Sequence, residues 1–122
     1  PAPLWGRFDS SPGSVAAAVY EKTLNELARK TRPKLKGLIM MAPFYIEPNR
    51  ADAMRARMDE YGALVKKVAA RHDALFIDTQ AAFEPVLQHL HANAIAWDRV
   101  HPNIIGHAVI ARAFMQAVGA QI

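Results

Sequence analysis

The chain has 122 residues, of which 52% are hydrophobic and 21% charged, which is the composition of one soluble globular domain and not of a disordered segment. No apolar run approaches the ~20 residues that a membrane-spanning helix needs, and the absence of cysteine excludes disulfides, thiolate nucleophiles and cysteine-based zinc sites. The formal net charge of +4 raises the hypothesis of nucleic-acid binding, but no aromatic residues interleave with the densest basic stretch, RKTRPKLK, as a base-stacking surface requires.

A first helix is predicted over residues 15–30, after a segment rich in proline and glycine. Residues 1–13 oppose regular structure and lack the basic-then-apolar pattern of a signal peptide. Ser14 is a suitable N-cap. The stretch RKTRPKLK lies where this helix ends, and cations there favour the negative end of the helix dipole while they stay in water. The apolar residues that share one helix face are Val19, Tyr20, Leu24, Leu27 and Ala28.

Two short apolar segments predict strands that are buried on both faces. The first is residues 38–42, closed by Pro43, and the second is ALFIDT, which ends at Asp78. Asp78 is expected to cap the helix that follows. The alternative is a pocket carboxylate, because the ends of parallel strands line clefts in this architecture.

Helical patterns occupy most of the remaining chain. An amphipathic helix is predicted over 52–71, a shorter one over 80–90 in which Pro85 is a candidate break or bend, and a last one over 103–118. Helices that alternate with short apolar strands indicate an α/β fold with a parallel sheet. Two strands make a poor sheet, so we expect further strands upstream of residue 1. The inward residues of the helix over 52–71 are expected to be Met54, Met58, Tyr61, Leu64, Val65 and Val68.

The stretch AWDRVHPN, residues 96–103, combines an acid and a base close to a helix start. Pro102 disfavours the helical conformation for His101, and Asn103 can then cap the last helix. The positive end of that helix favours a neutral imidazole, which can accept a proton near pH 7. Asp98, three residues earlier, can reach Nδ1–H and fix the tautomer, so that Nε2 faces a nucleophile. The alternative is a turn motif, in which Asp98 only accepts hydrogen bonds from local backbone amides.

The motif DRVHPN closely resembles the last conserved block of the SGNH, or GDSL, hydrolases, which are serine esterases and lipases. The stretches KGLIMMAPFYIEPN, MDEYGALVKKVAA, LFIDTQAAFEPVL and AWDRVHPNIIGHAVIARAF extend the resemblance to the C-terminal part of the acetylxylan esterases of that superfamily. The resemblance implies part of a three-layer α/β/α, flavodoxin-like fold, with residues 1–122 as the C-terminal portion of one domain. It also implies deacetylation of xylo-oligosaccharides or similar carbohydrate esters.

The resemblance assigns roles to three residues of the motif. Asp98 corresponds to the orienting acid and His101 to the general base and acid, while Trp97 is expected to help line the substrate pocket. Asn103 matches the Pro-Asn ending of the block and is expected to be a helix cap. No metal or organic cofactor is implied.

The serine nucleophile that this chemistry needs has no credible candidate in the chain. Ser10, Ser11 and Ser14 are its only serines, and FDSSPG resembles a Gly-Asp-Ser motif only superficially, because no buried strand precedes it. The oxyanion donors of the family, a Gly and an Asn, are not matched either. The chain is therefore expected to be the C-terminal piece of an enzyme. The alternatives are a truncated, non-catalytic homologue that acts as a binding or assembly module, and a site completed by another subunit.

The expected partners follow from these interpretations. They are a missing N-terminal half with the Ser nucleophile and the oxyanion Gly and Asn, and an acetylated carbohydrate or small ester. Esterases of this kind can form homo-oligomers, and the resemblance extends that expectation to this chain. We expect a cytoplasmic protein without a membrane or nucleic-acid partner. His89 and His91 point to different faces of a helix end and are not expected to bind metal, and His107 is expected at the surface or in packing.

Overall fold

The computed structural model describes residues 15–120, and it confirms the predicted alternation of helices and strands. Helix and strand boundaries agree with the sequence patterns to within a few residues, and the largest differences are at the C-terminal end of the helix around Pro85 and at the start of the first helix. The elements are α1 (Ala17–Thr31), β1 (Ile39–Met41), α2 (Ala53–Arg71), β2 (Leu75–Ile77), α3 (Thr79–Leu87) and α4 (Ile104–Ala117), with short 3₁₀ turns at Arg32–Lys34 and Ala92–Ala94.

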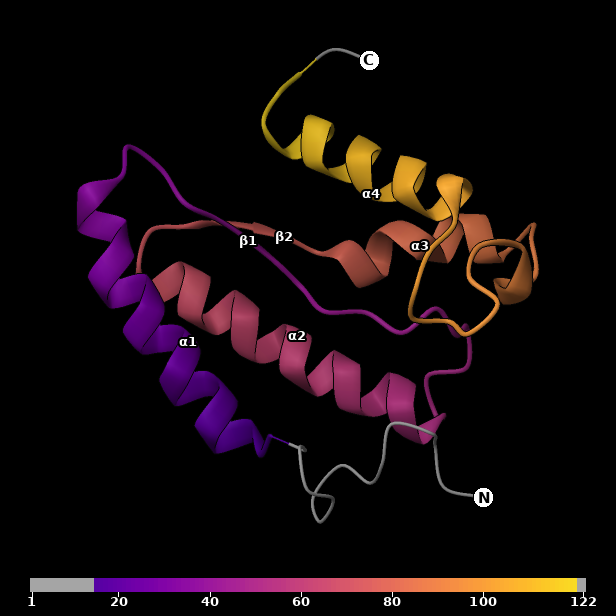
Figure 1. Cartoon of the computed structure of the whole chain (residues 1–122), viewed down its shortest axis with the longest axis horizontal. Helices are drawn as coiled ribbons and strands as arrows, with labels where there is room; N and C mark the ends of the chain where they lie inside the picture. Colours follow the sequence, from indigo (N-terminus) through magenta and orange to yellow (C-terminus); the bar gives the residue numbers. More distant parts are fainter. Residues whose placement is uncertain (1–14, 121–122) are drawn as a thin grey trace.

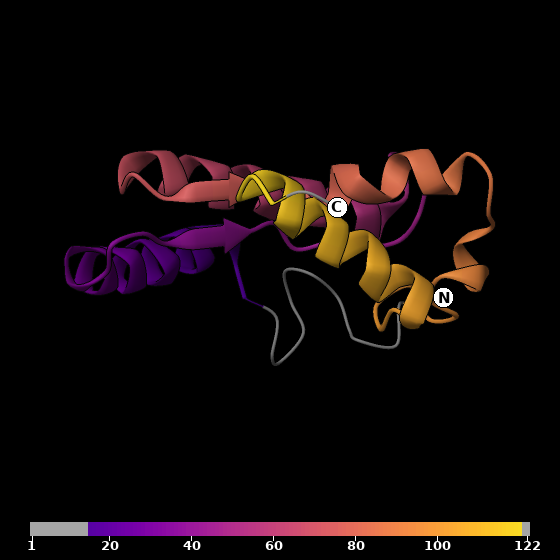
Figure 2. The ribbon, with the colours of Figure 1, turned by 90° about the horizontal axis from the view of Figure 1, so that it is seen from above.

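The two strands form a parallel sheet with helices on both faces. Met40 of β1 is the partner of Phe76 in β2, and the ladder is extended by hydrogen bonds at both ends. Figure 1 shows α1 and α2 on one face of the sheet and α4 on the other. Viewed from above, α1 lies on the β1 side and α2 on the β2 side (Figure 2). In the part of the chain that the structure describes, each strand has one strand neighbour, so the predicted shortage of strands is confirmed for these residues.

Polar side chains cap three of the four helices. Asp52 accepts a hydrogen bond from the amide of Arg55, and Asp78 accepts one from the amide of Ala81, which confirms Asp78 as a cap. The prediction for the first helix was wrong in detail: α1 begins two residues later than expected, Ala16 is its N-cap, and no side chain caps it. Ser14 lies outside the described residues.

Pro85 does not break α3, which instead ends at Leu87. The helix therefore ends three residues earlier than the pattern predicted.

The core of the described residues consists of two clusters of buried side chains. The first joins α1 to α2 and the sheet and contains Ala28, Met40, Val65, Val68 and Ala69. The second joins the loop after β1 to α3 and the segment before α4, and its buried members are Ile46, Phe83, Ala92, Ile95 and Ala96. The second cluster anchors the loop that carries Asp98 and His101, because its buried member Ala96 directly precedes this loop.

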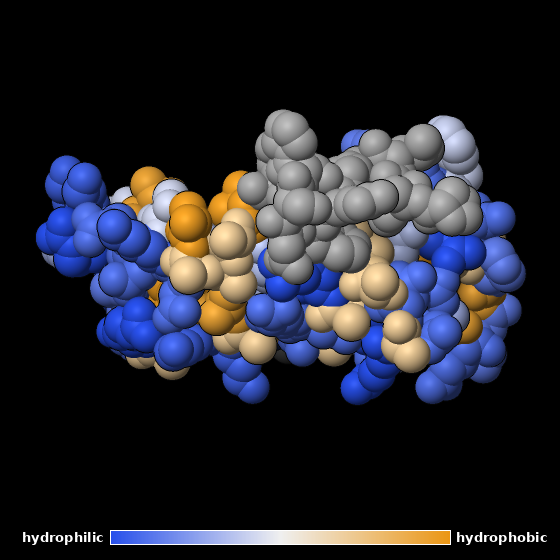
Figure 3. All heavy atoms as spheres, turned by 90° about the horizontal axis from the view of Figure 1, so that it is seen from below, coloured by the Kyte–Doolittle hydropathy of each residue, from blue (hydrophilic) through white to orange (hydrophobic). Residues whose placement is uncertain are grey.

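Part of the apolar surface of α1 is not covered. Val19 and Leu27, which belong to the predicted apolar face of this helix, are 54% and 59% exposed. Near them a groove of about 260 Å³ runs between α1 and β1, lined by Leu24, Met41 and eight other residues. Figure 3, seen from the side of α1 and α2, shows hydrophobic residues exposed among the charged ones. Within residues 15–120, no helix has the length and apolar character needed to cross a bilayer.

Candidate acid–base site

Asp98 and His101 are in direct contact on the loop between the Ala92–Ala94 turn and α4. The Oδ2 atom of Asp98 lies 2.5 Å from Nδ1 of His101. The Oδ1 atom accepts hydrogen bonds from the amides of Val100, at 2.9 Å, and His101, at 2.8 Å. One carboxylate oxygen therefore closes the turn, and the other contacts the imidazole.

The start of α4 fixes the end of this loop. Asn103 is the predicted N-cap, and its Oδ1 accepts hydrogen bonds from the amides of Ile105 and Gly106. Its Nδ2 donates to the carbonyl of Ala94, at 2.8 Å. Pro102 sits so close to Gly106 that a Cβ atom at Gly106 would lie 2.4 Å from the Cβ of Pro102. The absence of a side chain at Gly106 therefore allows the loop to close onto the helix.

The hydrogen bonds to Asp98 also determine its charge. The amide of His101, then the imidazole of His101 and the amide of Val100, lower the pKa of the Asp98 carboxyl to about 2. The carboxylate is therefore ionised at neutral pH. An ionised carboxylate on Nδ1 favours the tautomer with a proton on that nitrogen and stabilises the imidazolium that forms when Nε2 takes up a proton.

The imidazole and the preceding aromatic ring are open to solvent. The His101 side chain is 82% exposed, and Trp97 is also 82% exposed. Asp98, in contrast, has 18% of its side chain exposed. The arrangement places an oriented base at the surface of the described part of the chain, where Nε2 can meet a group supplied by another segment.

Other residues near the site have structural roles. Phe44 packs against Phe83 with 5.1 Å between ring centroids, and it belongs to the second core cluster. The Nδ1 atom of His91 accepts a hydrogen bond from the amide of Asn93, and His107 contacts the carbonyl of Asn103 from an exposed position.

The sequence did not predict the contacts of three charged residues near the site. Glu47 forms an ion pair with Arg99, the residue directly after Asp98. Arg55 of α2 is buried, with 3% of its side chain exposed. The only sequence signal is that Arg55 lies one position after the predicted inward Met54, which is too weak to identify a buried guanidinium.

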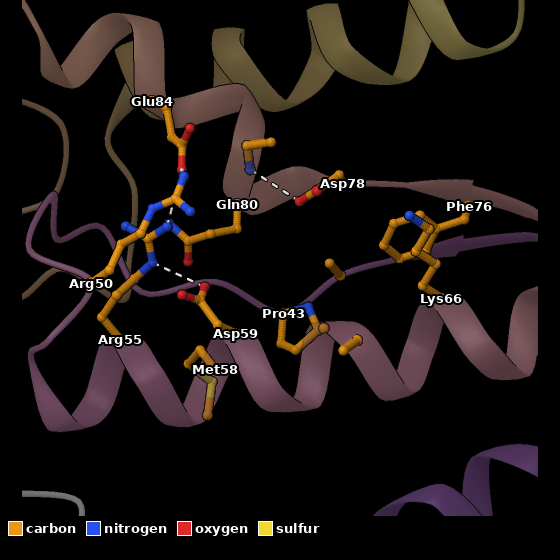
Figure 4. Close-up of a pocket in the computed structure, with 14 residues that line it drawn as sticks. Pro43, Arg50, Arg55, Met58, Asp59, Lys66, Phe76, Asp78, Gln80 and Glu84 are labelled. Atoms are coloured by element: carbon orange, nitrogen blue, oxygen red, sulfur yellow. Dashed lines mark hydrogen bonds and ion pairs between the residues drawn. The ribbon is translucent and has the colours of Figure 1, made fainter.

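Arg55 lies at one end of a polar pocket of about 340 Å³ between α2 and α3 (Figure 4). Arg55 pairs there with Asp59 and Glu84, and Glu84 also pairs with Arg50. Neither Asp98 nor His101 lines this pocket. Its charged groups largely satisfy one another, so the pocket is part of the scaffold and not of the acid–base pair.

Comparisons with known proteins agree with the resemblance carried by the motif. The GDSL-like lipase/acylhydrolase family model matches residues 7–109. A curated acetylxylan esterase of Geobacillus stearothermophilus is 53% identical over 100 residues, which are 82% of this chain and 46% of that protein. The chain therefore spans about half the length of the curated relative it matches.

Solved structures give the same result. LAE5, an alpha/beta hydrolase from the metagenome of Lake Arreo, Spain, is 56% identical with a TM-score of 0.86, over 87% of this chain and 49% of its own. Axe2, an acetylxylan esterase of Geobacillus stearothermophilus, is 50% identical with a TM-score of 0.87, over 88% and 49%. Structures of Axe2 include catalytic mutants in which a serine, an aspartate or a histidine is replaced by alanine, and that aspartate and histidine are three residues apart.

Proposed function

The chain belongs to the GDSL-like lipase/acylhydrolase family, and from this premise we propose that it is the C-terminal portion of a serine esterase in which Asp98 and His101 are the acid and base of the triad. The observation that carries the proposal is the 2.5 Å contact between Asp98 Oδ2 and His101 Nδ1, which leaves Nε2 free for proton transfer. The aspartate and histidine of the Axe2 catalytic mutants have the same spacing, which supports the assignment.

In the proposed reaction, His101 moves protons while a serine forms and breaks the covalent bonds. Nε2 takes the hydroxyl proton as the serine Oγ attacks the ester carbonyl, and a tetrahedral oxyanion forms. The imidazolium, stabilised by Asp98, returns the proton to the departing alcohol, and an acyl-enzyme remains. Water then attacks the acyl-enzyme with His101 again as the base, and the carboxylic acid is released.

We propose that the nucleophile and the oxyanion Gly and Asn lie in an N-terminal half of the protein, outside residues 15–120. The described residues contain no serine, and Ser10, Ser11 and Ser14 lie outside them. Two observations support a missing half: the chain spans about half the length of its relatives, and the apolar groove between α1 and β1 is uncovered. The strand edge of β1 is where further strands of a parallel sheet would pair.

The proposed substrates are acetylated xylo-oligosaccharides or similar carbohydrate esters. This follows the names of the two Geobacillus stearothermophilus relatives. Trp97 is proposed to line the substrate pocket, because an exposed aromatic ring directly before the acid offers a flat apolar face to a sugar. A solved Axe2 variant carries isoleucine in place of the tryptophan directly before its aspartate, so this position has been a target of substitution there.

The test is hydrolysis of p-nitrophenyl acetate and of acetylated xylo-oligosaccharides by the full-length protein that contains this chain. His101→Ala is expected to lower kcat by about 10³-fold or more, and Asp98→Asn by a comparable factor. The control is His89→Ala, an exposed histidine that contacts neither Asp98 nor His101, and this variant is expected to keep full activity. Hydrolysis that survives His101→Ala would contradict the assigned role. A full-length protein without any esterase activity would favour the binding or assembly module instead.

The cytoplasmic location and a homo-oligomeric state stay predictions. Cell fractionation tests the first, and light scattering of the full-length protein tests the second.

A further inference from the structure

Arg99, between Asp98 and Val100, has an unusual backbone conformation. Its φ is +66°, in the left-handed region that a residue with a side chain rarely adopts. The conformation of this residue decides whether the following two amides face the Asp98 carboxylate. Because this region is unfavourable for a residue with a side chain, contacts from the surrounding structure must hold Arg99 there.

Arg99 is held by three separate contacts. Its amide donates to the carbonyl of Ala96, at 3.0 Å, and its carbonyl accepts from the amide of Ile46, also at 3.0 Å. Its guanidinium forms an ion pair with Glu47. Ile46 has no exposed surface and belongs to the second core cluster, so the loop after β1 anchors Arg99 through both backbone and side chain.

Glu47 is itself fixed from the body of the molecule. Its Oε2 accepts a hydrogen bond from the amide of Asn49, at 2.9 Å, and its carbonyl accepts one from Nη1 of the buried Arg55, at 2.7 Å. The side chains of Glu47 and Arg99 are only 13% and 29% exposed. Solvent therefore screens this ion pair less than a typical surface pair.

We propose that Glu47 and Arg99 are positioning residues, whose ion pair holds the loop of Asp98 and His101 in its working geometry. The proposal rests on the proposed esterase function and assigns to it two residues that touch neither substrate nor reacting atoms. Glu47 acts through Arg99, and Arg99 acts through the turn that aims the amides of Val100 and His101 at Asp98.

The test compares Glu47→Gln, Arg99→Gln and the double variant in the full-length protein. Each single substitution is expected to lower kcat on p-nitrophenyl acetate by roughly 10- to 100-fold with little change in KM, because a small misplacement of the base slows chemistry more than binding. The double variant is expected to be no slower than the slower single variant, because both substitutions remove one interaction. Arg99→Gly keeps the left-handed turn without strain but lacks the ion pair, and it is expected to be slow as well.

Arg32→Gln is the matched control. Arg32 contacts both the carbonyl and the carboxylate of Asp73, a second non-glycine residue with positive φ, at +52°. This pair lies at the turn before β2, so its loss is expected to leave kcat unchanged. Fully additive losses in the double variant, or wild-type kcat in Glu47→Gln, would overturn the proposal.

A second readout does not depend on activity. The ring ¹⁵N chemical shifts of His101 report its tautomer, which is expected to be the single Nδ1–H form in the wild type and in Arg32→Gln, and a mixture in Glu47→Gln. If the wild type shows no esterase activity but Glu47→Gln still loses the single tautomer, the proposed function fails and the positioning role stands. An unchanged single tautomer in Glu47→Gln would overturn the positioning role.

Discussion

The Asp98 carboxylate receives its hydrogen bonds from a segment of four residues, two from backbone amides and one from the imidazole of His101. Substitution of the His101 side chain leaves both amides in place. The largest single cause of the lowered pKa of Asp98 is the amide of His101 and not its ring. The acid of the pair is therefore prepared by the backbone of its own turn.

We predict that Asp98 keeps a lowered pKa in the His101→Ala variant, between the wild-type value of about 2 and the ordinary value near 3.8. A ¹³C-detected titration of the Asp98 carboxyl measures it. A pKa that returns fully to the ordinary value would show that the ring dominates.

The lowered pKa of Asp98 also makes the free energy of unfolding depend on pH. The ionised carboxylate stabilises the folded state above about pH 4, and this stabilisation is lost as the pH falls toward about 2.

The start of α4 has a steric requirement that the middle of α2 does not share. A Cβ atom at Gly106 would lie 2.4 Å from Pro102 and 2.9 Å from Ile95, whereas one at Gly62 would meet only Ala42, at 3.6 Å. Both glycines lie in helices, where alanine is intrinsically favoured. The two positions therefore separate packing from helix propensity.

For these elements we predict opposite effects of the same substitution. Gly106→Ala is expected to destabilise the full-length protein by about 1–3 kcal/mol, because the loop must move away from the helix. Gly62→Ala is expected to stabilise it by about 0.5–1 kcal/mol. Denaturant unfolding of both variants measures the difference. Equal and favourable effects at the two sites would show that the loop before α4 moves freely.

Local sequence signals account for much of this architecture. The caps Asp78 and Asn103 and the contact of Asp98 with His101 involve residues two or three positions apart, and the sequence predicts them. The cap Asp52 is equally local, but the sequence predicts this residue only as the start of its helix. What it does not predict are contacts between distant segments. Glu47 and Arg99 are 52 residues apart and no periodicity links them.

The burial of a charged side chain is also difficult to predict from the sequence. Arg55 lies in a helix with other cations, and its burial becomes intelligible only when Asp59, Glu84 and the carbonyl of Glu47 are seen around it. The shift of the start of α1 has a simpler reason, because no side-chain cap fixes this end of the helix.

For the molecule as a whole, the uncovered groove and the single strand neighbour of β1 predict that residues 1–122 do not form a stable monomer in isolation. Size-exclusion chromatography with light scattering is expected to show self-association or aggregation of the isolated chain. Co-expression with the proposed N-terminal half is expected to restore a defined species. A monodisperse 13.5 kDa protein with a cooperative melt would contradict this.

The edge of β1 has a practical meaning for protein engineering. Asp98 and His101 lie in this chain, and the proposed nucleophile lies in the N-terminal half that would pair with this edge. Under the proposed function, this chain and the N-terminal half, expressed as two polypeptides, would each lack activity, and ester hydrolysis would begin only when they associate. If the two halves were fused to two proteins of interest, binding between those proteins would be detected as nitrophenolate released from p-nitrophenyl acetate.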